Sequence, residues 1–219
     1  MNLRSITLFS CLLLGIINSL VAQDKKSLQI KRSSEAPKID GILDEAVWEN
    51  AEIATNFISF RPEIGKQRPK EERTEIKMTY DNQAIYIAAY LYDDPTKIMK
   101  QLTSRDNFGQ SDFLGIIINP NNDAQNDTEF FVFGSGQQAD ALANPTIGED
   151  FGWNAVWQSA VKIVDNGWIV EVKIPYRCLR FTDQEDPVWG IQFHRHFRRE
   201  RSQYPWNPID PTKGNIGIY

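Results

Sequence analysis

The chain has 219 residues, of which 24% are charged and 41% are hydrophobic, and its formal net charge at pH 7 is −5. This length is ample for one domain with a sizeable core. A mildly acidic chain lacks the basic patch that attracts nucleic acid or an anionic membrane surface, so we expect neither to be its main partner.

The first 22 residues predict a secretory signal peptide. Arg4 supplies the positive end, an apolar run extends over residues 6–17, and Ala22 ends a plausible cleavage site. The alternative is a signal anchor, but a membrane-spanning helix needs about 20 apolar residues and this run is shorter. Residues 23–35 are polar, which predicts a flexible leader. We therefore expect an exported protein of the periplasm, the outer membrane or the extracellular space.

The sequence APKIDGILDEAVWENA, residues 36–51, opens the part that we expect to fold. Gly41 suits a tight turn, and Asp44 is a residue type that caps helices. The short helix that follows would have an apolar face ending at Trp48. We expect this segment to pack Trp48 against a sheet.

From residue 73 onward, short alternating or wholly apolar runs recur between turn residues. They predict strands over residues 74–80, 84–92, 113–118, 130–133, 153–164, 168–174 and 189–199. The sequence Asp-Asn-Gly at 165–167 predicts a tight hairpin, and Pro175 predicts the end of a strand followed by one helical turn. The expected fold over residues 36–219 is all-β, an antiparallel β-sandwich of immunoglobulin-like or jelly-roll type with short helical turns.

Five stretches together resemble the family 9 carbohydrate-binding module and its relatives. They are PKIDGILDEAVW, TEIKMTYDNQAIYIAAYLYDD, SDFLGIIINPNND, NAVWQSAVKIVDNGWIVEVKIPYRCLRF and WGIQFHRHFRRE, in the family's order. The pattern is most similar to the version at the amino end of exported bacterial proteins that also carry a region resembling an outer-membrane β-barrel. The resemblance implies a β-sandwich that binds glycan, with such a barrel as an expected partner. The chain stops at KGNIGIY, within an expected strand, which suggests a domain truncated at its C-terminus.

The resemblance also implies where a sugar would lie. In sugar-binding members two tryptophans sandwich the sugar ring, while a glutamate and an arginine bind its hydroxyls. The alignment puts Gly115 at the glutamate position, Phe131 at the arginine position and Phe108 near the first tryptophan. The stretch YPWNPIDPTKGNIGIY resembles the closing segment, which places Trp206 at the second tryptophan with Asn207 beside it. The implied carbohydrate contacts are Trp206, Asn207 and Phe108; Trp206 either faces solvent or folds onto the core.

The loop NPNNDAQND, residues 119–127, concentrates oxygen donors. Ca²⁺ prefers about six to eight oxygen ligands, and the resemblance adds that the family often holds structural calcium. The sequence predicts a weak calcium site, because neutral asparagine contributes less than aspartate; the alternative is a solvated polar turn. The predicted ligands are Asn119, Asn121, Asp123 and Asp127.

His194 and His196 stand two residues apart on an expected strand, so they would share a face, as a zinc site requires. Four arginines crowd the same stretch and oppose a dication electrostatically. We expect these arginines to pair with carboxylates such as Glu200, or to meet an anionic ligand or partner.

No nucleophile with a base, no glycine-rich phosphate loop and no well-spaced carboxylate pair stands out, so we expect no catalysis by this domain. Such modules often accompany glycoside hydrolases in carbohydrate catabolic processes. The sequence predicts an exported, non-catalytic carbohydrate-binding module-like domain of a larger carbohydrate-processing or outer-membrane protein. The alternative is a structural or interaction domain that packs on an outer-membrane barrel or partner and retains no sugar site.

Overall fold

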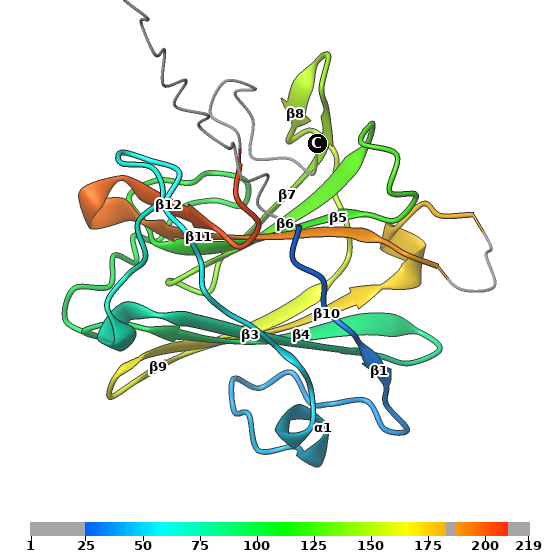
Figure 1. Ribbon diagram of the computed structural model, residues 1–219, viewed down its shortest axis with the longest axis horizontal. Coiled ribbons are helices and arrows are strands. Elements are labelled where there is room, and N and C mark those ends of the chain that lie inside the picture. The colour runs from blue at the N-terminus through cyan, green and yellow to red at the C-terminus, as the bar shows by residue number, and fades with distance from the viewer. Residues whose placement is uncertain (1–24, 183–186, 210–219) are drawn as a thin grey trace, which may run out of the picture.

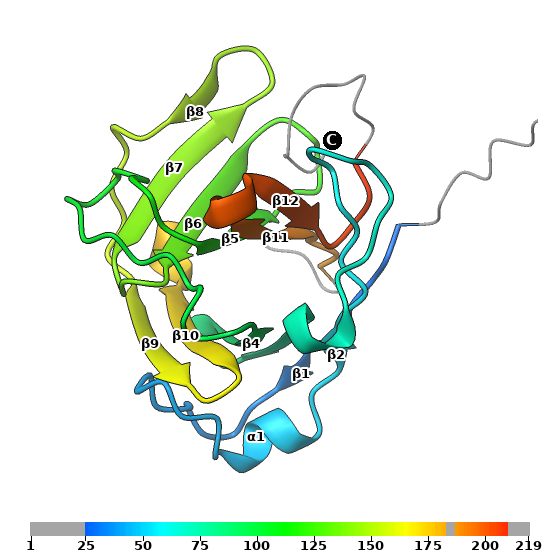
Figure 2. The same cartoon turned by 90° about the vertical axis from the view of Figure 1, so that its left-hand side faces the viewer.

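The computed structural model describes residues 25–182 and 187–209, and the strands of this part form two sheets that lie face to face (Figures 1 and 2). The first sheet has the order β1-β3-β4-β10-β9, with β2 also paired to β3; the second has the order β12-β11-β5-β6-β7-β8. The pairings between these strands are antiparallel except that of β1 with β3, which is parallel. The predicted β-sandwich is therefore confirmed.

The strands of the first sheet are β1 (Lys31–Arg32), β2 (Ile53–Ala54), β3 (Thr74–Tyr80), β4 (Ala84–Tyr92), β9 (Gln158–Val164) and β10 (Gly167–Pro175). Those of the second are β5 (Phe113–Asn119), β6 (Asp127–Phe133), β7 (Gln138–Asn144), β8 (Gly148–Asp150), β11 (Gly190–Phe197) and β12 (Ser202–Pro205). The helical turns are α1 (Ala46–Glu49), η1 (Lys70–Glu72), η2 (Tyr176–Cys178) and η3 (Arg198–Glu200).

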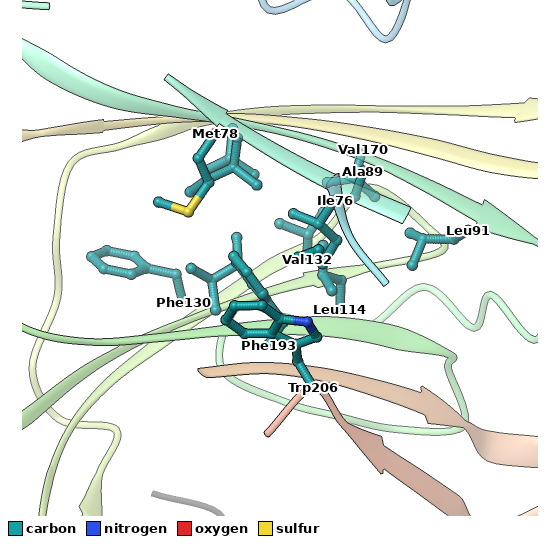
Figure 3. Close-up of a cluster of buried hydrophobic side chains, with 14 of the residues drawn as sticks. Ile76, Met78, Ala89, Leu91, Leu114, Phe130, Val132, Val170, Phe193 and Trp206 are labelled. Atoms are coloured by element: carbon teal, nitrogen blue, oxygen red, sulfur yellow. The ribbon is translucent and has the colours of Figure 1, made fainter. Parts of the chain in front are cut away.

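The core fills the space between the two sheets. Side chains that alternate along each strand point inward from both layers, and Figure 3 shows them meeting between the sheets. Full burial of one such apolar side chain stabilises the fold by about 1.5–3 kcal/mol. The labelled members are Ile76, Met78, Ala89, Leu91, Leu114, Phe130, Val132, Val170, Phe193 and Trp206.

The predicted strand 153–164 is too long, because β9 begins only at Gln158. The carboxylate of Asp140 on β7 accepts hydrogen bonds from the Ala155 backbone N–H (2.9 Å) and from Trp157 Nε1 (2.8 Å). The first bond satisfies a backbone N–H that would otherwise need a partner on a neighbouring strand. Residues 153–157 therefore cross between the sheets as a loop.

The lid segment, residues 36–51, covers the outer face of the first sheet, as the position of α1 in Figure 2 shows. Trp48 is 2% exposed and packs with Tyr86 and Ala88 of β4, as the sequence predicts. The carboxylate of Glu171 on β10 accepts the backbone N–H groups of Asp40 (3.0 Å) and Gly41 (2.7 Å). This buried carboxylate fastens the turn of the lid to the sheet.

Two expectations about the N-terminal part are wrong. Residue 44 does not cap the helix, since the N-cap is Glu45 and makes no side-chain capping bond. The part of the expected flexible leader that the structure describes is bound to the first sheet. Strand β1 pairs with β3, and the Ser33 N–H donates to the Tyr80 carbonyl (2.7 Å). The predicted signal peptide, residues 1–22, lies outside the described residues.

The hairpin between β9 and β10 depends on a glycine. Gly167 pairs with Val164 directly after the two-residue loop and has φ +148°. A Cβ at this position would lie 2.3 Å from the Leu91 carbonyl oxygen and 2.8 Å from the Tyr92 Cα of β4. Both contacts are with backbone, so no side-chain rotation can relieve them.

We expect Gly167→Ala to lower the free energy of unfolding by about 3 kcal/mol, because the added methyl group forces β10 away from β4. The matched control is Gly136→Ala, which also has a positive φ, +84°, but nothing within 4 Å of the added Cβ. The control should cost about 1 kcal/mol. Urea denaturation of both variants measures the difference, and equal midpoints would contradict the assignment.

Candidate functional site

The outer face of the second sheet is where the family resemblance puts the sugar. The strand register places Gly115 of β5 between Phe131 of β6 and His194 of β11. A Cβ at Gly115 would lie 3.2 Å from the Phe131 ring and 3.3 Å from the His194 Cβ. The ring of Phe131 therefore occupies the space that a glutamate at position 115 would need.

Phe108 lies at the centre of a phenylalanine cluster on this face. Its ring centroid is 5.0–5.4 Å from four other rings, with edge-to-face angles that favour aromatic packing. The loop that carries it is fixed by the Thr103 hydroxyl, which donates to the Asn107 carbonyl (2.6 Å). Phe108 is thus partly buried as a packing residue. The surrounding rings belong to Phe113, Phe131, Phe133 and Phe151.

Trp206 is 3% exposed, so the option of a solvent-facing ring is wrong. The ring packs into the core against Phe193, with centroids 5.6 Å apart (Figure 3). The physical reason is register: Tyr204 and Trp206 stand two residues apart and point to the same inner face.

Asn207 is hydrogen-bonded to two other segments of the fold. Its backbone N–H donates to Gln192 Oε1 (2.8 Å), and the Gln192 amide donates to its carbonyl (2.9 Å). Its side-chain oxygen accepts the Lys26 N–H (2.6 Å). Asn207 therefore clasps the N-terminal segment to β11, which leaves little of its hydrogen-bonding capacity for a ligand.

Three of the four predicted calcium ligands lie together. Buried Asn119 donates its amide nitrogen to Asp127 (3.1 Å), and its side-chain oxygen accepts the Asp123 N–H (3.3 Å). Asn121 accepts the Thr182 N–H (3.3 Å) instead, and one oxygen of Asp123 accepts the Gln125 N–H (2.9 Å). The calcium site stays a prediction.

His194 and His196 share the outer face of β11, as predicted, but lack the further ligands of a metal centre. Burial lowers the pKa of His194 to about 3 and that of His196 to about 4. Within residues 25–182 and 187–209, no group of three or more histidine, cysteine, aspartate or glutamate side chains is placed to hold a metal ion. The same part of the chain contains no helix with the length and apolar character of a membrane span.

A buried carboxyl lies near the opposite edge of this face. Glu129 of β6 is buried, and its Oε2 atom has no hydrogen-bond partner among the described residues. Burial is the main cause that raises the pKa of Glu129 to about 9, and the negative charge of Glu149 adds to it. Glu129 is therefore a neutral acid at pH 7.

The expected pairing with carboxylates is confirmed for Arg195 and Arg199, whereas the Arg198 side chain donates to Gln110 Oε1 (2.8 Å). Arg199 donates two hydrogen bonds to the buried carboxylate of Asp93 (2.7 and 3.0 Å), and its Nε lies 3.4 Å from Glu200. Arg195 is fully buried, 3.5 Å from Asp93, and burial lowers its pKa to about 10. Asp93, directly after β4, is buried at the centre of this network.

A pocket of about 300 Å³, the Arg68 pocket, opens at the end of the sandwich where β3 begins and β11 ends. Its lining combines aromatic rings with planar polar side chains. Arg68 lies over the ring of Phe197 (4.4 Å) and donates both terminal nitrogens to Glu200 (2.6 and 3.1 Å). The lining residues are Thr55, Asn56, Phe57, Gln67, Arg68, Lys70, Glu72, Arg73, Thr74, Phe197 and Tyr204.

Sequence reasoning did not find this pocket. Its lining comes from three segments that the fold brings together: residues 55–57, residues 67–74, and the neighbourhood of Phe197 and Tyr204. The one available signal is the charged stretch KQRPKEER directly before β3. A charged stretch of this kind is also typical of an ordinary solvated loop.

Comparison with known proteins gives a consistent assignment. The model of the family described as carbohydrate family 9 binding domain-like matches residues 39–197. No curated protein matches the chain.

Solved structures share the fold. A family 9 carbohydrate-binding module from Caldicellulosiruptor kristjanssonii in complex with glucose has a TM-score of 0.57 at 18% identity, covering 81% of this chain and 88% of that one. Its complex with cellotriose has the same score and identity, with coverages of 86% and 90%. A protein from Bacteroides uniformis, assigned as carbohydrate-binding, has a TM-score of 0.63 at 10% identity, with coverages of 85% and 91%.

The buried carboxyl predicts a pH effect. Because the folded pKa of Glu129 lies above its unfolded value, Glu129 penalises folding above about pH 4.5, and the penalty grows until about pH 9. Glu129→Gln should therefore stabilise the protein by about 2–4 kcal/mol more at pH 8 than at pH 5. Exposed Glu71→Gln is the control. Urea denaturation at both pH values measures this, and a stabilisation that does not change with pH would contradict it.

Proposed function

The chain belongs to the carbohydrate family 9 binding domain-like family, and from this membership we propose that it is a glycan-binding module whose ligand occupies the Arg68 pocket. The observation that carries the proposal is the lining of that pocket. Sugars offer hydroxyls that need hydrogen-bond partners and C–H faces that pack on rings. Structures of this fold in complex with glucose and cellotriose support the assignment of ligand class.

The pocket has suitable size and chemistry. Its volume of about 300 Å³ is at the lower end of ligand pockets, which suits one or two sugar rings. The side chains of Asn56 and Gln67 are exposed at the pocket and make no hydrogen bond to another described residue. Their amides can each donate to and accept from a hydroxyl. Phe197 and Tyr204 are buried beneath the Arg68 guanidinium, which lies 4.4 Å from the Phe197 centroid and 5.5 Å from the Tyr204 centroid, so they support the floor from below.

The sugar site that the family resemblance implies, on the outer face of the second sheet around Gly115, is a weaker candidate. Phe131 fills the space beside Gly115, and the ring of Phe108 closes over it. Trp206 stands at the second tryptophan position, and its ring is buried in the core. A sugar at that place would have to displace packed aromatic rings.

We further propose that the module is exported, is non-catalytic and serves a larger carbohydrate-processing or outer-membrane protein. The signal-peptide pattern supports export. The family match is to a binding domain, and the carboxylate of Asp93 is neutralised by Arg199. Both observations support binding without hydrolysis.

A second candidate function is a domain that packs on a barrel or another protein partner. It is favoured by a surface aromatic cluster formed by Tyr176, Phe181 and Trp189, whose ring centroids lie 5.1–6.3 Å apart. Phe181 is 43% exposed and neighbouring Val188 is 73% exposed. Exposed apolar side chains gathered in this way are typical of protein contacts.

Isothermal titration with cellotriose tests the first proposal. Gln67→Ala should weaken binding about 3- to 10-fold, the equivalent of one lost hydrogen bond, because it removes an amide from the pocket. Gln83→Ala is the matched control, since Gln83 is equally exposed but lies in the turn at the other end of the β3–β4 hairpin. Unaltered binding in Gln67→Ala, or an equal loss in Gln83→Ala, would rule out this pocket.

A further inference from the structure

The lining of the Arg68 pocket is richer in cationic than in acidic side chains, unlike the chain as a whole. The formal net charge of the chain is −5, yet three cationic side chains line the pocket against the single carboxylate of Glu72. The cations are Arg68, Lys70 and Arg73. A hollow lined mainly by one sign of charge concentrates ligands of the other sign.

Part of this positive charge is already neutralised. Arg68 pairs with Glu200 and Glu72, and Arg73 pairs with Glu75 (2.7 Å) while lying over the ring of Tyr92. These pairs hold the wall of the pocket in shape. They leave the two arginines with little charge to offer a ligand.

Two donors remain uncommitted. The ammonium of exposed Lys70 makes no ion pair or hydrogen bond with any other described residue. The Nε atom of Arg68 is buried and has no hydrogen-bond partner among the described residues. A buried N–H without a partner costs about 1–3 kcal/mol, so an acceptor that reached it would be bound favourably.

We propose that the ligand of this pocket is an acidic sugar, a uronate. The inference rests on the glycan-binding function proposed above and adds the chemical class of the glycan. The carboxylate of the uronate is recognised by the exposed ammonium of Lys70, through a charge-assisted bond stronger than those of neutral hydroxyls. The hydroxyls of the same ring meet the amides of Asn56 and Gln67.

Glucuronate and glucose form a matched pair of probes, since they differ only in a carboxylate that replaces a hydroxymethyl group. In calorimetric titrations of the full chain at low salt, glucuronate should bind about tenfold more tightly than glucose. Raising the NaCl concentration to about 0.5 M should remove most of that preference, because the contact at Lys70 is exposed and salt screens it.

Variants assign the effect to the pocket. Lys70→Gln should weaken glucuronate about 2- to 5-fold and leave glucose unchanged, the range expected for one exposed charge. Lys38→Gln removes the charge of an exposed lysine in the lid segment and should change neither affinity. A similar loss in both variants would show an effect of overall charge and would overturn the assignment.

Other outcomes separate this inference from the function on which it rests. Glucose binding as tightly as glucuronate would overturn the acidic preference and leave glycan binding intact. Displacement of glucuronate by equimolar acetate would show an anion site without recognition of the sugar, which overturns the proposal. Failure of glucose, cellotriose and glucuronate alike would remove both the inference and the proposed glycan-binding function.

Discussion

The structure depends on one constraint: the central strands β4 and β5 are mostly apolar on both faces. Inward side chains such as Ile87 and Ile116 build the core, but the outward neighbours Ala88 and Phe113 are buried as well. An apolar outer face must be covered, because leaving it in water forfeits about 25 cal/mol for each Å² exposed. The lid segment covers the first sheet, and the phenylalanine cluster covers part of the second. The Arg68 pocket lies instead at the end of the sandwich.

Local patterns predicted much of the fold. Strands β3 and β4 match the expected ranges because alternation and an Asp-Asn turn act within a few residues. Trp48 was assigned to a buried lid because its segment is amphipathic over one turn. Strand β7 was not predicted, since one face holds only alanine and the other holds Gln138, Asp140 and Asn144 with a single leucine, which together give a weak hydrophobic signal.

The features that sequence could not predict are set by contacts distant in the chain. The loop before β9 is determined by Asp140, and the burial of Trp206 is determined by its register beside β11. The Arg68 pocket has the same origin, because none of its three segments forms a concave surface alone. The filled slot beside Gly115 is an intermediate case. The paired replacement, glycine at one family position and phenylalanine at the other, is visible in the sequence, but the fit of one into the other needs the structure.

The clasp between Lys26 and Asn207 has a mechanical consequence. Lys26 is hydrogen-bonded through its backbone to the Asn207 side chain and through its ammonium to the Trp206 carbonyl (2.7 Å). A force applied through the chain before residue 26 and after residue 207 would load these few bonds first. These bonds would break before the force was transmitted to the strands of the sandwich.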